Sequence, residues 1–397
     1  MNYPNLLKAT QSAAGLRLRI RLQPMYGEGE LIFPSTVAGG TYLISDRRIP
    51  GYETAIPCAI IDSVQSQANR LESALLEDIK SGNLHLPYVV SDFTGLPNLI
   101  KDIGTITCFE APHRIFDAIL RDSVDAEGKH FPLTEEGKAA CDATSRNATA
   151  IFRISPTSLL LGSWDSTGTS GGLGEKYTRC VVSELVGVNC LAAKRAGVRV
   201  DPLNSSSGAD PAKILKETED KMWAAIAANR KKLTKPSELN HSSIPWEAGS
   251  EAQPHGGVTV DYIQQSTTIS LPALRQLQFP VEGKSTDETS AKAQAVLAAM
   301  ALHAAALNLE KGWHLRSRCD LILDQKTVEW EILNPTSKEQ TTLKSEDTRR
   351  LLNEAIAEAK AVGLPWNDEP LRLTPSAALA KLVTTSQQQH REKGEQE

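Results

Sequence analysis

A strict alternation near the start of the chain constrains the fold more than any other feature. In LRLRIRLQP, residues 16–24, leucine or isoleucine alternates with arginine three times. Alternation with period two is typical of a β-strand that is buried on one face. The buried face would carry Leu16, Leu18, Ile20 and Leu22, and the other face Arg17, Arg19 and Arg21, spaced about 7 Å apart. Either a solvated sheet face or a bound polyanion explains such a row of like charges.

The composition is that of an ordinary soluble globular protein. The chain has 397 residues, of which 40% are hydrophobic and 23% charged, and its formal net charge is −5. This length allows roughly one to three domains. A negative net charge argues against a protein coated with basic residues for bulk nucleic-acid binding, but it leaves room for local basic stripes.

Neither a metal site nor a membrane segment is expected. None of the 6 cysteines stands in a C-x-x-C or in a Cys/His cluster with zinc spacing. The N-terminus MNYPNLLKAT lacks the apolar core of a signal peptide. The most apolar segment, residues 295–309, falls short of the roughly 20 residues that span a bilayer. We therefore expect a cytoplasmic protein whose thiols are reduced and mostly fill the core.

Two segments have the apolar spacing of amphipathic helices. In residues 62–80, Asp62 is the expected N-cap, and the polar face carries Ser66, Asn69, Arg70 and Ser73. In APHRIFDAILRDS, residues 111–123, the apolar residues pack inward and another face carries Arg114, Asp117 and Arg121. Both polar faces could contact a ligand or simply be solvated.

A glycine-rich segment, DSTGTSGGLGE, lies between an expected strand at SLLLGSW and an expected helix that places Lys176, Arg179 and Ser183 on one face. Backbone N–H groups, a helix N-terminus and two cations would make it the best local anion site. It does not match a P-loop or a dinucleotide fingerprint, and its G-x-S-x-G lacks the flanking strand and helix of a nucleophile elbow. Without a catalytic set, the basic faces suit a phosphate backbone more than bond breaking.

The rest of the chain contains an insertion between further strands and helices. Residues 201–257 are polar and rich in proline and serine, and we interpret them as an insertion. Alternation returns at residues 258–271, a helix is expected over 286–310, and WHLRSRCDLIL places His314, Arg316 and Arg318 on one face. A helix over 345–362 and a disordered tail follow. The order is compatible with a β-α-β-β-α-β core with large insertions, and with other α/β or α+β folds.

An ordered set of segments resembles one known family. It comprises LRLRIRLQP…FPSTVAGGTY, DSVQSQANRLESALL, APHRIFDAILRDS, LLLGSWDSTGTSGGLGEKYTRCVVSELVG, LPALRQLQFP and LRSRCDLIL, and it runs from about residue 14 to 333. The resemblance is to the RAMP-superfamily backbone subunit of the type I CRISPR effector, Cascade, of subtype G, formerly called U. It implies an α+β fold: an RRM-like, ferredoxin-like palm with large finger and thumb insertions.

The resemblance also implies a domain organisation. The palm with inserted fingers would comprise residues 1–200 and 258–340, followed by a C-terminal helical region over 341–384 and the disordered tail over 385–397. Residues 201–257 are the candidate thumb, and the hairpin at 24–34 is the second choice.

The implied function is guide binding rather than catalysis. Several copies would form a helical filament along a CRISPR RNA (crRNA) and present its spacer to target DNA. The other implied partners are the large subunit, a fused repeat-processing and cap subunit, and a recruited helicase–nuclease that cuts the DNA. Such a subunit has no catalytic residues, cofactor, metal or membrane contact of its own.

The expected RNA contacts hold phosphates and 2′-hydroxyls without reading sequence. They are Ser66, Gln67, Asn69 and Arg70 on the first helix, Arg114 and Arg121 on the second, Ser163, Trp164, Lys176 and Arg179 around the glycine-rich segment, and Arg17, Arg19, Arg21, Arg316 and Arg318 on strands. If the two arginine-bearing strands are neighbours, they build one basic surface. Two alternatives remain: an RNA-cleaving relative that uses Asp165, and a metabolic enzyme that holds a nucleotide in the glycine-rich segment.

Overall fold

The alternating segment forms strand β1 (Gly15–Pro24), which lies inside a nine-stranded antiparallel sheet in the computed structural model. The structure describes residues 1–37, 41–166, 174–194, 197–198, 214–215, 233–234, 243–244, 256–282, 284 and 286–396. The main path of the sheet is β17 (Trp313–Arg316), β18 (Cys319–Leu323), β1, β16 (Tyr262–Ser270), β9 (Val181–Val188), β3 (Ile56–Asp62) and β2 (Ile44–Arg47). Off this path, β19 (Trp330–Leu333) pairs with β1 and with β20 (Lys338–Thr341).

The pairing register separates the sheet into a buried face and an open face. Leu18 of β1 lies opposite Thr267 of β16, which lies opposite Ser183 of β9, and all three are buried. The neighbouring positions point the other way and are more accessible to solvent. We call this second surface the open face; it carries Arg17, Arg19 and Arg21 on β1, Gln264, Ser266 and Thr268 on β16, and Val182 and Glu184 on β9.

Two long helices cover the buried face. Helix α2 (Val64–Lys80) reaches it through Gln67, which accepts a hydrogen bond from the Ser183 hydroxyl. Helix α9 (Thr286–Glu310) contacts α1 (Tyr3–Ser12), α2, α8 (Leu271–Arg275) and α10 (Ser345–Ala361). Within the described residues α9 is the one helix long and apolar enough to cross a membrane, and 89% of its apolar window is buried, as in a core helix.

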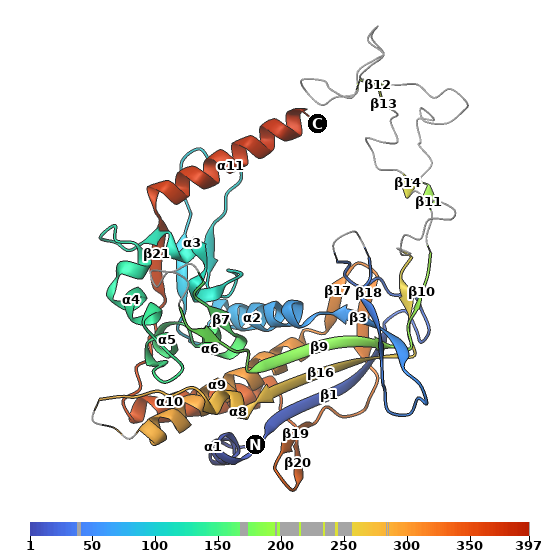
Figure 1. Cartoon of the computed structure of the whole chain (residues 1–397), viewed down its shortest axis with the longest axis horizontal. Helices are drawn as coiled ribbons and strands as arrows, with labels where there is room; N and C mark the ends of the chain where they lie inside the picture. The colour runs from blue at the N-terminus through green and yellow to red at the C-terminus, as the bar shows by residue number, and fades with distance from the viewer. Residues whose placement is uncertain are drawn as a thin grey trace.

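The order of these elements along the chain is β1, α2, β9, β16, α9 and β18. Their four strands are neighbours in the order β18-β1-β16-β9, and each helix lies between two of these strands in sequence. Figure 1 shows β9, β16 and β1 side by side. The α+β character expected from the sequence is confirmed, with strands β2 and β3 extending the sheet beyond β9.

The segment between α2 and β9 builds a second layer with the C-terminal strand (left in Figure 1). Its sheet order is β5 (Thr105–Thr107), β4 (Val89–Asp92), β21 (Leu371–Pro375) and β6 (Ser123–Val124). Around it lie η1 (Arg114–Phe116), α3 (Ala118–Arg121), η2 (Phe131–Leu133), α4 (Glu135–Cys141), α5 (Thr149–Ile154), α6 (Pro156–Leu161) and α11 (Ala377–Gln396). Short pairs join β7 (Ser163–Trp164) to β8 (Lys176–Tyr177) and β10 (Leu191–Ala192) to β15 (Val258–Thr259). The remaining pairs are β11 (Gly197–Val198) with β14 (Ser243–Ile244), and β12 (Ile214–Leu215) with β13 (Leu233–Thr234).

The long expected helices are confirmed, and one cap is corrected. Helices α2, α9 and α10 match the expected ranges closely. The N-cap of α2 is Ser63, whose hydroxyl accepts from the Ser66 N–H at 3.2 Å, whereas Asp62 was expected. Asp62 instead accepts hydrogen bonds from the side chains of Gln67 and Arg70, because it is buried at the end of β3 and needs those partners.

Three local predictions between residues 111 and 188 were wrong. The expected helix 111–123 is broken at Asp117, whose backbone is extended and whose carboxylate caps the short α3. Of the strand predicted at SLLLGSW, only Ser163–Trp164 form a strand, β7; the preceding residues belong to α6, which ends at Leu161 before Gly162 with φ +84°. The expected helix after the glycines is strand: β9 has several valines, and pairing with β16 and β3 outweighs its helical spacing.

Other differences concern the C-terminal third and the insertion. WHLRSRCDLIL forms a hairpin rather than one strand, because the chain turns between β17 and β18, where Arg318 adopts φ +58°. The tail expected to be disordered continues α11 to Gln396, since its Gln, Glu, Lys and Arg residues are good helix formers. The candidate thumb, residues 201–257, lies outside the described residues except for 214–215, 233–234, 243–244 and 256–257.

Candidate nucleic-acid interface

The polar face of α2 presents exposed amide and hydroxyl groups. Asn69 is exposed and Ser66 is half-buried on the solvent side of the helix. Arg70 is half-buried: its guanidinium forms an ion pair with Asp62 at 2.9 Å and donates to the Leu315 carbonyl of β17 at 3.1 Å. Together with a longer bond of 3.4 Å to the His314 carbonyl, these contacts hold the guanidinium between α2 and β17, and the Arg70 side chain remains 30% exposed.

Gln67 does not lie on this surface. It is fully buried and donates to Asp62 at 2.5 Å, and its carbonyl oxygen accepts from Ser183 at 2.9 Å. Gln265 of β16 also donates to Gln67, at 3.3 Å. The expected RNA contact is therefore part of a polar network that joins α2 to the sheet, because every polar group at this depth needs a partner.

Arg114 is likewise buried, in an ion pair that ties η1 to α2. Its Nε and Nη2 atoms donate to the two carboxylate oxygens of Glu72 at 2.7 and 2.9 Å, and its Nη1 atom donates to the Gly162 carbonyl at 2.7 Å. Burial raises the pKa of Glu72, although the charge of Arg114 opposes this shift. Because Gly162 directly precedes β7, this ion pair fixes β7 beside α2.

The β7–β8 pair carries an exposed aromatic ring and a cation. Trp164 is 49% exposed, and the Lys176 Nζ atom lies 5.5 Å from its ring centroid. Ser163 points inward, where its hydroxyl donates to the Ser158 carbonyl. Burial, followed by the nearby charge of Arg114, lowers the pKa of Arg179, whose Nε donates to the Leu161 carbonyl at 3.1 Å. The expected helix N-terminus at this site is absent from the described residues, which instead form these strands.

Two further candidates near this surface are engaged in other contacts. Arg121 forms an ion pair with the adjacent Asp122 at 2.8 Å. Asp165, the candidate acid of an RNA-cleaving protein, is 4% exposed, and the backbone of Gly174 packs against it.

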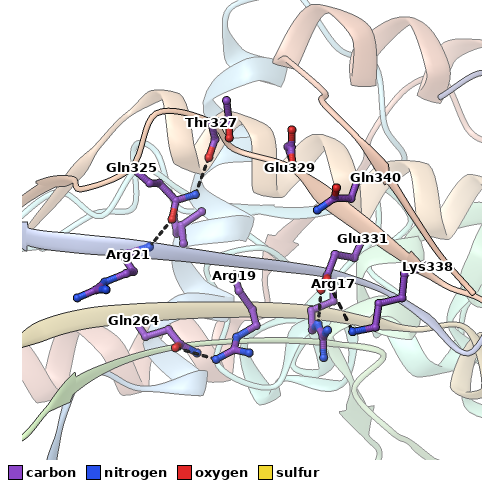
Figure 2. A pocket seen from close by; sticks show the side chains of 11 residues that line it. Arg17, Arg19, Arg21, Gln264, Gln325, Thr327, Glu329, Glu331, Lys338 and Gln340 are labelled. Atoms are coloured by element: carbon purple, nitrogen blue, oxygen red, sulfur yellow. Dashed lines mark hydrogen bonds and ion pairs between the residues drawn. The ribbon is translucent and has the colours of Figure 1, made fainter. Parts of the chain in front are cut away.

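The three arginines of β1 lie together on the open face, as the alternation predicted, but their partners differ. The Arg17 Nε atom donates to Glu331 of β19 at 2.6 Å, and Arg19 donates to the side-chain oxygen of Gln264 at 2.9 Å (Figure 2). The Arg21 guanidinium lies over the Tyr262 ring, 4.0 Å from its centroid. The hydrogen bond from Arg17 and the charges of Arg17, Lys338 and Arg19 lower the pKa of Glu331.

Two cavities adjoin on this face. One of about 460 Å³ lies between the β1 arginines and a wall formed by residues 325–340. The other, of about 230 Å³, lies between β16 and a wall formed by residues 47–50. Arg19 and Gln264 line both cavities, so the two form one trough across the sheet.

The arginines of the β17–β18 hairpin do not join the β1 row. Strand β18 separates β17 from β1, so the condition for a single basic surface, that the two arginine-bearing strands are neighbours, is not met. Arg316 donates to the Pro34 carbonyl at 3.0 Å, and the Arg318 guanidinium lies 4.9 Å from the Phe33 ring centroid. Both side chains hold the segment around residue 33 against the hairpin.

Comparison with known families gives one match. Residues 16–191 match the family model described as CRISPR-associated protein GSU0053 (Cas_GSU0053). The match indicates a CRISPR-associated protein. No curated protein matches the chain. The matched residues include β1, α2, the β7–β8 pair and β9, and so contain all the expected RNA contacts except Arg316 and Arg318.

Sequence reasoning missed several residues of the trough. Tyr262 and Gln264 belong to the second alternating strand, so their face could have been predicted, but their pairing with β1 could not. Arg47 and Lys338 come from distant segments with no pattern of their own. Only the folded sheet brings these four side chains to the arginines of β1.

Proposed function

We propose that this CRISPR-associated protein is a multi-copy, non-catalytic backbone subunit of a type I-G Cascade complex in the cytoplasm. It binds crRNA by phosphates and sugars without sequence preference and presents the spacer to target DNA. Its partners are further copies in a helical filament, the large and cap subunits, and a recruited helicase–nuclease. The observation that carries the proposal is the family match over the elements that hold both basic surfaces.

The strand order supports an RRM-like palm within this proposal. The sequence β1, α2, β9, β16, α9, β18, with the spatial order β18-β1-β16-β9, is that of a β-α-β-β-α-β unit. The segment between α2 and β9 would form the fingers and residues 201–257 the thumb.

The guide surface is the helix side of the palm. Ser66 and Asn69 can hydrogen-bond 2′-hydroxyls, the exposed part of Arg70 and Lys176 can meet phosphates, and Trp164 can stack on a base. The buried Arg114–Glu72 pair holds β7 next to α2, so the two parts of this surface keep a fixed distance. Gln67, Arg114 and Ser163 support this surface from the protein interior and do not contact RNA.

The test is to purify the tagged protein co-expressed with its genomic neighbours and a CRISPR array, and to sequence the bound nucleic acid. RNAs of uniform length, each a spacer flanked by repeat, are expected. Lys176→Gln should reduce their yield, whereas Arg350→Gln, which removes an exposed charge on α10, should not. No enriched RNA would overturn the proposal. Cleavage of RNA that is lost in Asp165→Ala would favour a ribonuclease instead.

A further inference from the structure

The open face presents two arginines that have no carboxylate partner among the described residues. Arg17 and Arg47 are neutralised by Glu331 and Glu184, at 2.6 and 3.0 Å. Arg19 contacts only the neutral amide of Gln264, and Arg21 lies on the ring of Tyr262. Both arginines are exposed. Their charges are therefore available to an anionic ligand in the middle of the trough.

The trough has the shape of a channel for an extended chain. Its floor consists of side chains from β1, β16 and β9, and its two walls are residues 325–340 and 47–50. Because both cavities share Arg19 and Gln264, a ligand that crosses the sheet from one wall to the other passes over these two residues. Amide side chains continue along the floor and wall at Gln264, Gln325 and Gln340.

We propose that the trough binds a single-stranded nucleic acid, with a phosphate on Arg19 and an unpaired base stacked on the guanidinium of Arg21. The guanidinium fork of Arg19 matches a phosphate geometrically. The Arg21 guanidinium already lies over the Tyr262 ring, 4.0 Å from its centroid, and its other side can serve as a stacking surface. The amide of Gln340, which lines the same cavity, can donate to and accept from a base edge.

These features favour a nucleic acid over an acidic peptide or the acidic surface of a second copy. A carboxylate partner would use only the charges of Arg19 and Arg21, and it would gain nothing from the Arg21–Tyr262 stack. It would also approach Glu329 and Glu331, which line the same cavity. A strand with bases offsets that repulsion through stacking on Arg21, which a carboxylate does not form.

This strand is distinct from the proposed guide. Helix α2 and its polar face belong to the buried side of the sheet, as the Gln67–Ser183 contact shows, whereas Arg19 and Arg21 point to the opposite side. The inference does not depend on guide binding, since the trough is complete within the sheet and the β19–β20 hairpin.

The experiment measures fluorescence anisotropy of labelled 20-nucleotide oligonucleotides with the full chain, with its guide RNA if it carries one. The oligonucleotides lack complementarity to any guide and comprise single-stranded RNA, single-stranded DNA, an abasic DNA strand and a duplex. The variants are Arg19→Gln, Arg21→Gln and Tyr262→Leu, with Arg350→Gln as the matched charge control. Thermal unfolding checks that each variant folds.

The expected results separate the two contacts. Arg19→Gln should reduce the magnitude of the slope of log affinity against log salt concentration by about 0.7, which is the contribution of one phosphate contact on a single strand. Tyr262→Leu, which keeps the Arg21 charge, should weaken binding of base-bearing strands about tenfold and leave the abasic strand little changed, since stacking of one base is lost. Arg21→Gln should weaken both strands, because a cation is lost, and the base-bearing strand more, because stacking is lost as well. The duplex should bind more weakly than either single strand, and comparison of RNA with DNA shows which strand the trough prefers.

Two results would overturn the inference. One is wild-type affinity for single strands in both Arg19→Gln and Arg21→Gln. The other is a change in oligomer mass with unchanged strand affinity, which would assign the trough to a neighbouring copy. Failure of guide binding is recognised separately, as absence of co-purified RNA, and it leaves the oligonucleotide titration readable.

Discussion

Replacement of Arg114 by methionine should destabilise the protein strongly and should do so through Glu72. The side chains of Arg114 and Glu72 are 10% and 2% exposed, and two hydrogen bonds of 2.7 and 2.9 Å join them. Arg114→Met leaves a buried carboxylate without its cation and the Gly162 carbonyl without its donor. Loss of one partner of a buried pair costs about 3–5 kcal/mol.

The double variant Arg114→Met with Glu72→Met provides the control. It removes both charges and fills the space with apolar atoms, so most of the loss should return. About 1 kcal/mol should remain lost because the hydrogen bond to the Gly162 carbonyl is not replaced. The assay is urea unfolding of wild type, the two single variants and the double variant. Equal destabilisation of the double variant and Arg114→Met would refute the claim that an uncompensated Glu72 causes the effect.

Three further predictions concern the core, the sheet and the guide surface. Burial lowers the pKa of His303 below its usual value, so the unfolded chain binds the proton more readily than the folded protein. The free energy of unfolding should therefore fall as pH drops below about 6.5, by at most about 1.4 kcal/mol per pH unit. Urea unfolding of wild type and His303→Gln at pH 7.5 and 5.5 measures this, and an equal change of stability with pH in both proteins would contradict it. Gly187→Ala should cost about 1–3 kcal/mol, because its Cβ would meet Val260 at 2.6 Å; an unfolding midpoint equal to that of wild type would exclude the clash. Trp164→Ala should lower guide affinity about tenfold with little effect on stability, measured by filter binding beside Leu133→Ala, an equally exposed apolar residue.

The regular elements with long apolar patterns could be predicted from the sequence. The alternation in β1 and the spacing in α2 and α9 each follow from one local period, and a local period survives folding when the core needs that face. Even there, the pattern could not show that Gln67 and Glu72 are buried. Their burial depends on Ser183 and Arg114, which lie far away along the chain.

Predictions failed where short segments depend on distant partners. The helical spacing of Lys176, Arg179 and Ser183 is real, but β9 pairs on both sides, with β16 and β3, and this pairing decides its conformation. Arg114 adopts φ +55° in order to reach Glu72 and Gly162, a conformation that no helical pattern encodes. In both cases tertiary contacts outweigh local preference.

The two basic surfaces follow from one property of the sheet. Side chains alternate across a strand, so a sheet that buries the face under α2 must present the other face to solvent or to a partner. In β1 that face carries arginine at three successive positions, 17, 19 and 21, where a solvated strand would need only some polar residue. Two of these arginines are left with neutral partners, although Glu184 and Glu331 stand nearby and pair with Arg47 and Arg17 instead. If this face were only solvated, replacing Arg19 and Arg21 by glutamine would leave the binding of single strands unchanged. If the face binds a ligand, the same two substitutions weaken that binding, and they therefore distinguish a ligand-binding trough from a solvated surface.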